Sequence, residues 1–307
     1  MKEKSPTADA GSRTTAFADA KKDLAAYFTR RPDVAMAFLF GSRGRKSGGT
    51  HAHSDWDIGI YFTPRSPELE FENSEGAYPE EDRVWADLTE ILHTDDIDLV
   101  VLNRAQASIA ATALSGAPLV IKDRGLWVRF MLVITRMAEE YRASAREYHE
   151  IVRRSRSLAP QDRERLERLA DFLEEQAGLY PVYRGFTQNE YEDDPRKRNE
   201  IERWLENIVN AVIDAGKVML GSEKRLIPPT YREIARRGAH RAGVSNDFAA
   251  RFDGWVRLRN VLAHEYLDIK WKRIAEFAST SEPTIRQFIS GIASFLAEAK
   301  GRQRNDA

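Results

Sequence analysis

The sequence predicts two unlike domains, an α+β domain built on a small mixed sheet and then an all-helical bundle. Three observations predict this division. Residues 55–62 alternate between two sets of side chains with the period of a strand. Apolar runs of strand length occur at 34–40 and 97–102, and loop and helix patterns separate these runs from residues 55–62. Beyond Pro160 no strand pattern occurs, and apolar residues recur at helical spacing.

The elements of the first domain follow from these patterns in order. A buried strand at 34–40 ends abruptly at Gly41-Ser42, which indicates a tight turn. Around it we expect a helix at 15–31, strands at 55–62, 97–102 and 118–121, and helices at 80–93 and 106–114. One long helix from 126 to about 156 is apolar early and charged late. The first domain is therefore expected to span residues 1–157, with a mixed sheet covered by helices.

The second domain, residues 158–307, contains only helical patterns. They lie at 160–178, 192–220, 229–242, 246–264 and 270–299. The second of these is strongly amphipathic, with Ile201, Trp204, Leu205, Ile208, Val212 and Met219 on one face. This half of the chain is therefore expected to be a helical bundle.

Composition limits the possible classes of protein. The 307 residues include 47 basic and 48 acidic ones, so nucleic-acid affinity requires a local patch rather than an overall positive charge. There is no cysteine, no apolar segment typical of a secretory signal, and no run of about 20 apolar residues. We therefore expect a cytoplasmic protein without a membrane partner.

The first candidate site combines a glycine turn with strand carboxylates. Gly41 lets the backbone approach a phosphate closely, and Ser42 offers a hydroxyl and an amide. Asp55 and Asp57, two apart on a strand, share one face, and Asp98 lies on another strand. Carboxylates in this arrangement suit Mg²⁺, which leaves coordination places for nucleotide phosphates. The alternative is an ordinary strand entry with acidic turn residues, which leaves the glycine turn unexplained.

These segments, FGSR, SDWDIGIYF and IDLVVLNRA, resemble the minimal nucleotidyltransferases (MNT) of the DNA-polymerase-beta superfamily over roughly residues 15–157. The resemblance implies ATP with Mg²⁺ as the donor, Ser42 and Arg43 on the phosphates, and Asp55 and Asp57 as metal ligands. Asp98 would be a third ligand or a base. We prefer it to the neighbouring Asp95 and Asp96 because it directly precedes an apolar run, as the family's third carboxylate does.

The second candidate site lies on the expected helix 246–264. Its apolar stripe includes Phe252 and Trp255, but the next position on the stripe is Arg259. Asn260 and His264, four apart, share a neighbouring face. Unpaired buried polar groups cost about 1–3 kcal/mol each, so such a cluster needs partners. A structural polar network or a helix end is the alternative to an active site.

The stretch RNVLAHEY resembles the ribonuclease signature of HEPN toxins in the MNT–HEPN toxin–antitoxin family, as do ERWLENIVNAVIDAGKVML and PPTYREIARRG. The resemblance implies that Arg259 holds the scissile phosphate of an RNA substrate and that Asn260 orients it. His264 would act as general acid or base, which suits its reference pKa of about 6.5. Tyr266 would be the residue that the nucleotidyltransferase modifies.

Helix geometry constrains this second site. Arg259 and His264 are five residues apart, about 140° around an ideal helix, so one straight helix cannot direct both at one phosphate. Either the helix breaks near Ala263 or two copies share the site. The HEPN resemblance implies a two-fold dimer, so we expect a homodimer formed through the HEPN helices.

Together these observations lead to one hypothesis, a fused toxin–antitoxin protein. Its first domain would transfer AMP from ATP to Tyr266 and so silence RNA cleavage by its second domain. One alternative is an antibiotic-type nucleotidyltransferase acting on small molecules, and another is a transferase acting on RNA ends. In either alternative the helical half would serve in binding or dimerisation. A further alternative is that the helical half is a dimerisation domain with no activity.

Overall fold

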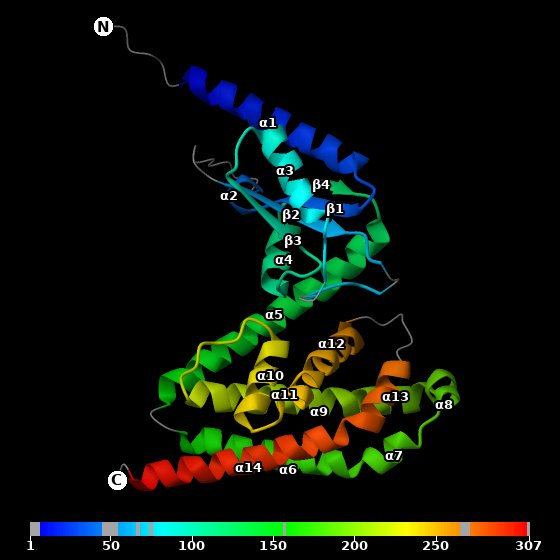
Figure 1. The fold of residues 1–307 in the computed structure, drawn as a ribbon, viewed down its shortest axis with the longest axis vertical. Coiled ribbons are helices and arrows are strands. Elements are labelled where there is room, and N and C mark those ends of the chain that lie inside the picture. The colour runs from blue at the N-terminus through cyan, green and yellow to red at the C-terminus, as the bar shows by residue number, and fades with distance from the viewer. Residues whose placement is uncertain are drawn as a thin grey trace. The chain divides into compact units, whose positions relative to one another are not determined.

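The structure is a computed structural model that describes residues 7–44, 55–65, 68–73, 76–155, 158–264 and 271–305. The chain forms two compact units (Figure 1). The boundary between them lies between Glu139 and Glu140. This division falls inside the long helix α5 (Arg124–Arg154), whereas the sequence analysis assigned that whole helix to the first domain. Each unit is described separately.

The first unit contains the expected mixed sheet. Its strands are β1 (Val34–Leu39), β2 (Trp56–Phe62), β3 (Ile97–Val101) and β4 (Ala117–Ile121). They are arranged in the order β3-β2-β1-β4, with β2 and β3 parallel and the other neighbours antiparallel. The expected strands are thus confirmed within one residue at each end.

Helices cover both faces of this sheet. On one face α1 (Thr7–Arg30) and α3 (Glu81–Leu92) share a core with alternate residues of β2. On the other face α4 (Ala107–Leu114) approaches Gly59, and the Phe130 ring of α5 lies 4.5 Å from the Tyr61 ring. Alternation along β2 therefore separates two buried faces rather than a buried face and a solvent face.

The second unit is a bundle around one helix, α9 (Pro195–Ser222), whose residues from Ile201 onward are mostly buried. Around it lie α6 (Pro160–Gly178), α7 (Tyr180–Arg184), α8 (Gln188–Asp193), α10 (Tyr231–Arg241), α11 (Asn246–Ala249), α12 (Arg251–His264), α13 (Trp271–Thr280) and α14 (Glu282–Asn305). Helices α9 and α10 touch through glycines, since a Cβ on Gly238 would lie 2.6 Å from the Cα of Gly216. The prediction of a helical bundle is confirmed.

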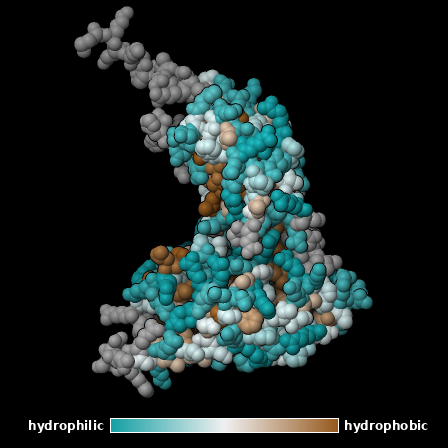
Figure 2. All heavy atoms as spheres, viewed as in Figure 1, coloured by the Kyte–Doolittle hydropathy of each residue, from teal (hydrophilic) through white to brown (hydrophobic). Residues whose placement is uncertain are grey.

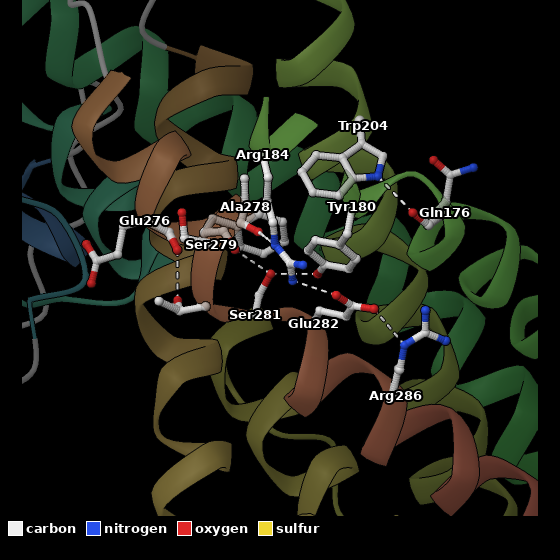
Figure 3. A network of polar contacts seen from close by, with 12 residues as sticks. Gln176, Tyr180, Arg184, Trp204, Glu276, Ala278, Ser279, Ser281, Glu282 and Arg286 are labelled. Atoms are coloured by element: carbon white, nitrogen blue, oxygen red, sulfur yellow. Dashed lines mark hydrogen bonds and ion pairs between the residues drawn. The ribbon is translucent and has the colours of Figure 1, made fainter. Parts of the chain in front are cut away.

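The expected single helix 270–299 is wrong, because the structure divides it at Ser281 into α13 and α14. Ser281 is fully buried, and its Oγ lies 2.6 Å from the Tyr180 Oη (Figure 3). Arg184 donates to the carbonyl of Ala278 near the end of α13. Pro283 lacks an N–H and therefore cannot continue α13. A serine shortly before a proline is a helix-start signal that the sequence contains.

Hydrophobic side chains are mostly internal, and in Figure 2 the visible surface is largely hydrophilic with separate hydrophobic patches. The large apolar residues that are exposed lie far apart in the sequence, namely Trp85, Ile109, Leu132, Val182 and Leu226. Among the described residues, no helix combines the length and the apolar character needed to cross a membrane.

Candidate active sites

The turn after β1 brings the backbone against a carboxylate. The short helix α2 (Gly41–Gly44) follows Phe40, whose N–H donates to the carbonyl oxygen of Asp57 at 2.9 Å. Gly41 has φ +64°, and a Cβ at this position would lie 1.9 Å from Oδ2 of Asp57. Only glycine meets both requirements without displacing that carboxylate. Ser42 follows within α2 and is partly exposed.

Three aspartates gather near the start of β2 and β3. Asp57 is paired in register with Asp98 on the neighbouring parallel strand, and Asp55 precedes Asp57 by two residues. Asp57 is partly buried, whereas Asp55 and Asp98 are exposed. Burial first, and then the charges of Asp98 and Asp55, raise the pKa of Asp57 above its ordinary value. The carboxylates of Asp98 and Asp55 are thus close enough to Asp57 for their charges to act on it.

Arg43 supplies positive charge at this cluster. Its guanidinium lies 4.4 Å from the centroid of the Trp56 ring, and Phe17 stacks on that ring at 5.6 Å. Burial lowers the pKa of Arg43, and the charges of Asp55, Asp96 and Asp57 oppose that shift. The positive charge of Arg43 also opposes, in part, the rise in the pKa of Asp57. The aromatic stack therefore holds the Arg43 guanidinium beside the carboxylates, in a position where it could also bind a nucleotide phosphate.

The donor set fits a hard divalent cation. Within the described part of the chain, no three acidic or histidine side chains already converge as a metal cluster. The acidic oxygens of Asp55, Asp57 and Asp98 are nevertheless the donors that Mg²⁺ prefers. Burial contributes most to the raised pKa of Asp57, and a bound cation would offset the smaller contribution from the charges of Asp98 and Asp55.

The second site lies on α12, whose neighbouring side chains are buried in the core of the second unit. Asn260 is 1% exposed and the Arg259 side chain 14% exposed. Nε of Arg259 donates to Oδ1 of Asn210 on α9 at 2.8 Å. Its Nη1 donates to Oε2 of Glu140 on α5 and to Oδ1 of Asn260, each at 3.1 Å. The partly buried arginine therefore has the partners that its position requires.

Tyr231, the first residue of α10, forms part of the wall at this arginine. Its ring centroid lies 5.9 Å from the guanidinium carbon of Arg259, and the Tyr141 ring meets it edge-on. Burial raises the pKa of Tyr231 to about 12, so its phenol is neutral at physiological pH. An aromatic wall excludes water on one side of the guanidinium and strengthens its interaction with an anion.

A hydrogen bond joins the neighbouring side chains of Arg259 and Asn260, and their role in one active site stays a prediction. The side chain of His264 and all of Tyr266 lie outside the described residues, as does the chain immediately after α12. Sequence reasoning missed Asn210, Glu140 and Tyr231. Asn210 had a signal, because it is a polar residue between Ile208-Val209 and Ala211-Val212 on a buried helix.

Two protein-family models each match a part of the chain. The family described as "Polymerase beta, Nucleotidyltransferase" matches residues 22–125, which include the turn at Gly41 and all three aspartates. The family described as "Ribonuclease HepT-like" matches residues 163–292, which include α9 to α13. Comparison with curated proteins and with solved structures gave no match.

Proposed function

Because the chain joins a nucleotidyltransferase domain to a HEPN-like ribonuclease domain, we propose that it is a self-regulating toxin–antitoxin fusion. The first domain transfers AMP from ATP to the hydroxyl of Tyr266. The second domain cleaves RNA until this modification silences it. The observation that carries the proposal is the presence of both residue sets, and of a tyrosine two residues beyond His264, in one polypeptide.

In the first reaction the Tyr266 oxygen forms a bond to the α-phosphorus of ATP. The bond from that phosphorus to the bridging oxygen of the β-phosphate breaks, and pyrophosphate leaves. Asp98 accepts the tyrosine proton, and the turn at Gly41 and Ser42 binds the departing phosphates beside Arg43. Asp55 and Asp57, with Asp98, would hold Mg²⁺, which supplies charge stabilisation for the nucleotide phosphates when bound.

In the second reaction the 2′-oxygen of RNA attacks the adjacent phosphorus, and the bond to the 5′-oxygen of the next nucleotide breaks. One proton leaves the 2′-hydroxyl and one reaches the departing 5′-oxygen. His264 takes part in this proton transfer as general acid or base. Arg259 binds the phosphate and stabilises its developing charge, and Asn260 accepts a hydrogen bond from Arg259 that helps to orient it.

Modification would block this second reaction directly. The AMP phosphodiester adds bulk and a negative charge two residues after His264 in the sequence. It would therefore compete with the RNA phosphate for the Arg259 guanidinium, a strong partner for phosphates. We also propose a cytoplasmic homodimer, because ATP and RNA are its ligands and HEPN relatives pair through their helices.

The test is mass spectrometry of the purified protein after incubation with ATP and Mg²⁺. We expect one or more adenylyl groups on the peptide that contains RNVLAHEY, and none on the Tyr266→Phe variant. The Asp57→Asn variant should remain unmodified although folded. Transfer to an added aminoglycoside or to RNA ends, with Tyr266 untouched, would instead support the two alternative transferases.

A further inference from the structure

The guanidinium of Arg259 is held through two of its three nitrogens. Nε and Nη1 make the hydrogen bonds to Asn210, Glu140 and Asn260. Within the described residues, Nη2 makes no hydrogen bond. A guanidinium is planar and rigid, so anchoring two nitrogens determines the direction of the third. The amino group at Nη2 is therefore the donor that an incoming anion can use.

We infer that Asn210 and Glu140 are positioning residues that direct Nη2 of Arg259 at the scissile phosphate. This inference rests on the proposed ribonuclease function. Neither residue belongs to α12, since Asn210 lies 49 and Glu140 119 positions away in the chain. Orientation of the phosphate-binding group thus depends on two other helices.

The two residues that anchor Arg259, Asn210 and Glu140, lie on helices that are also joined by a cluster of ion pairs. Farther along α9 and α5, Nζ of Lys217 is 2.7 Å from both Glu147 on α5 and Asp214 on α9. The Lys217 side chain is only 6% exposed, and Arg165 of α6 also pairs with Glu147. Glu140 and Glu147 are seven apart, as are Asn210 and Lys217, so each pair follows one helix face. Rigid helices hold a site more accurately than loops do.

The two anchors differ in charge, which separates their effects. Glu140 is a counter-ion that offsets the cost of burying Arg259, but its side chain is 31% exposed and would repel an RNA phosphate. Asn210 is neutral and accepts from Nε without competing with the substrate. Asn210 therefore governs orientation alone, and Glu140 governs both orientation and affinity.

The test measures RNA cleavage by the full-length protein carrying Asp55→Ala and Asp57→Ala, so that modification cannot interfere. The substrate is a random-sequence single-stranded RNA with a fluorophore and a quencher. The Asn210→Leu variant removes the acceptor at similar volume, and Asn207→Leu on the same helix is the matched control. We expect Asn210→Leu to lower kcat about tenfold or more, with a Tm close to that of the control.

Conservative variants separate positioning from structural support. Asn210→Asp keeps an acceptor and should retain kcat within about threefold while raising KM. Glu140→Gln also keeps an acceptor and should lower KM, whereas Glu140→Ala should lower kcat. The control for the Glu140 variants is Glu139→Gln, because Glu139 is an exposed neighbour on α5. If Asn210→Leu does not fold, the Glu140 pair gives the same comparison.

The outcomes are distinguishable. Equal kcat for Asn210→Leu and Asn207→Leu would overturn the inference, as would equal loss of kcat in Asn210→Leu and Asn210→Asp. If the parent protein leaves the RNA intact, the proposed function fails and the inference fails with it. Cleavage by the parent that persists in Arg259→Ala would show that another residue binds the phosphate.

Discussion

Replacing Gly41 by alanine should lower the rate of nucleotide transfer about a hundredfold while leaving the first domain folded. The added Cβ would lie 1.9 Å from Oδ2 and 2.5 Å from Cγ of Asp57. Real Cβ atoms essentially never come within 3.0 Å of another heavy atom, so the carboxylate must move by about 1 Å or more. A displacement of about 1 Å in a catalytic group costs roughly a hundredfold in rate. The left-handed φ of +64° should cost about 1–2 kcal/mol of stability in addition.

The assay is self-modification with labelled ATP, alongside thermal unfolding. Gly243→Ala is the matched control, because Gly243 has φ +74° and no atom within 4 Å of the added Cβ. It shares the backbone strain without the clash and should keep full transfer activity. We expect Gly41→Ala to lose about a hundredfold in rate at a comparable loss of Tm. Equal activity in the two variants would refute the argument that Gly41 makes room for the Asp57 carboxylate.

Three further predictions concern stability and toxicity. The fold raises the pKa of Asp57, so protonation of this carboxylate favours the folded state. That stabilisation is lost as the pH rises from the ordinary pKa of 3.8 through the pKa in the folded protein. Unfolding measured in a chelator should therefore show Asp57→Asn more stable than wild type above this window, and no such gain would contradict the shift. In cells, the Asp55→Ala, Asp57→Ala double variant should be more toxic than wild type, and adding His264→Ala should remove the toxicity. A harmless double variant with a folded, unmodified second domain would argue against the ribonuclease. Gly238→Ala should lower the unfolding free energy by about 1–3 kcal/mol in denaturant titrations, because its Cβ would meet Gly216 across α9 and α10, and an unchanged midpoint would show that the helices can separate freely.

The sheet and the long helices could be predicted because their signals are local. Strand alternation at 55–62 and the apolar face of α9 depend on residues within one element. The sequence placed Asp57 and Asp98 on two different strands but could not predict that they lie opposite each other. Their pairing depends on strand register, which is determined by packing over the whole sheet. The break at Ser281 had a local signal, but a continuous apolar pattern on both sides obscured it.

The partners of Arg259 could not be predicted in the same way. A buried arginine requires acceptors, yet nothing local specifies which distant residues supply them. Asn210 interrupts an apolar face and so marks itself as a candidate. Glu140 lies in the charged half of a long helix, where acidic residues are common and carry no special signal. Their choice depends on how α5, α9 and α12 pack, which is a property of the whole bundle.

The anchoring of Arg259 bears on how modification would act on cleavage. Glu140 already places one carboxylate on the guanidinium, and one further anion can be received at Nη2. An AMP phosphodiester and an RNA phosphate bound together would put three negative groups around a single positive charge in a partly buried site. Such an arrangement is strongly unfavourable where water screens poorly. The two phosphates would therefore exclude each other, so each protein molecule would be either modified and inactive or unmodified and fully active.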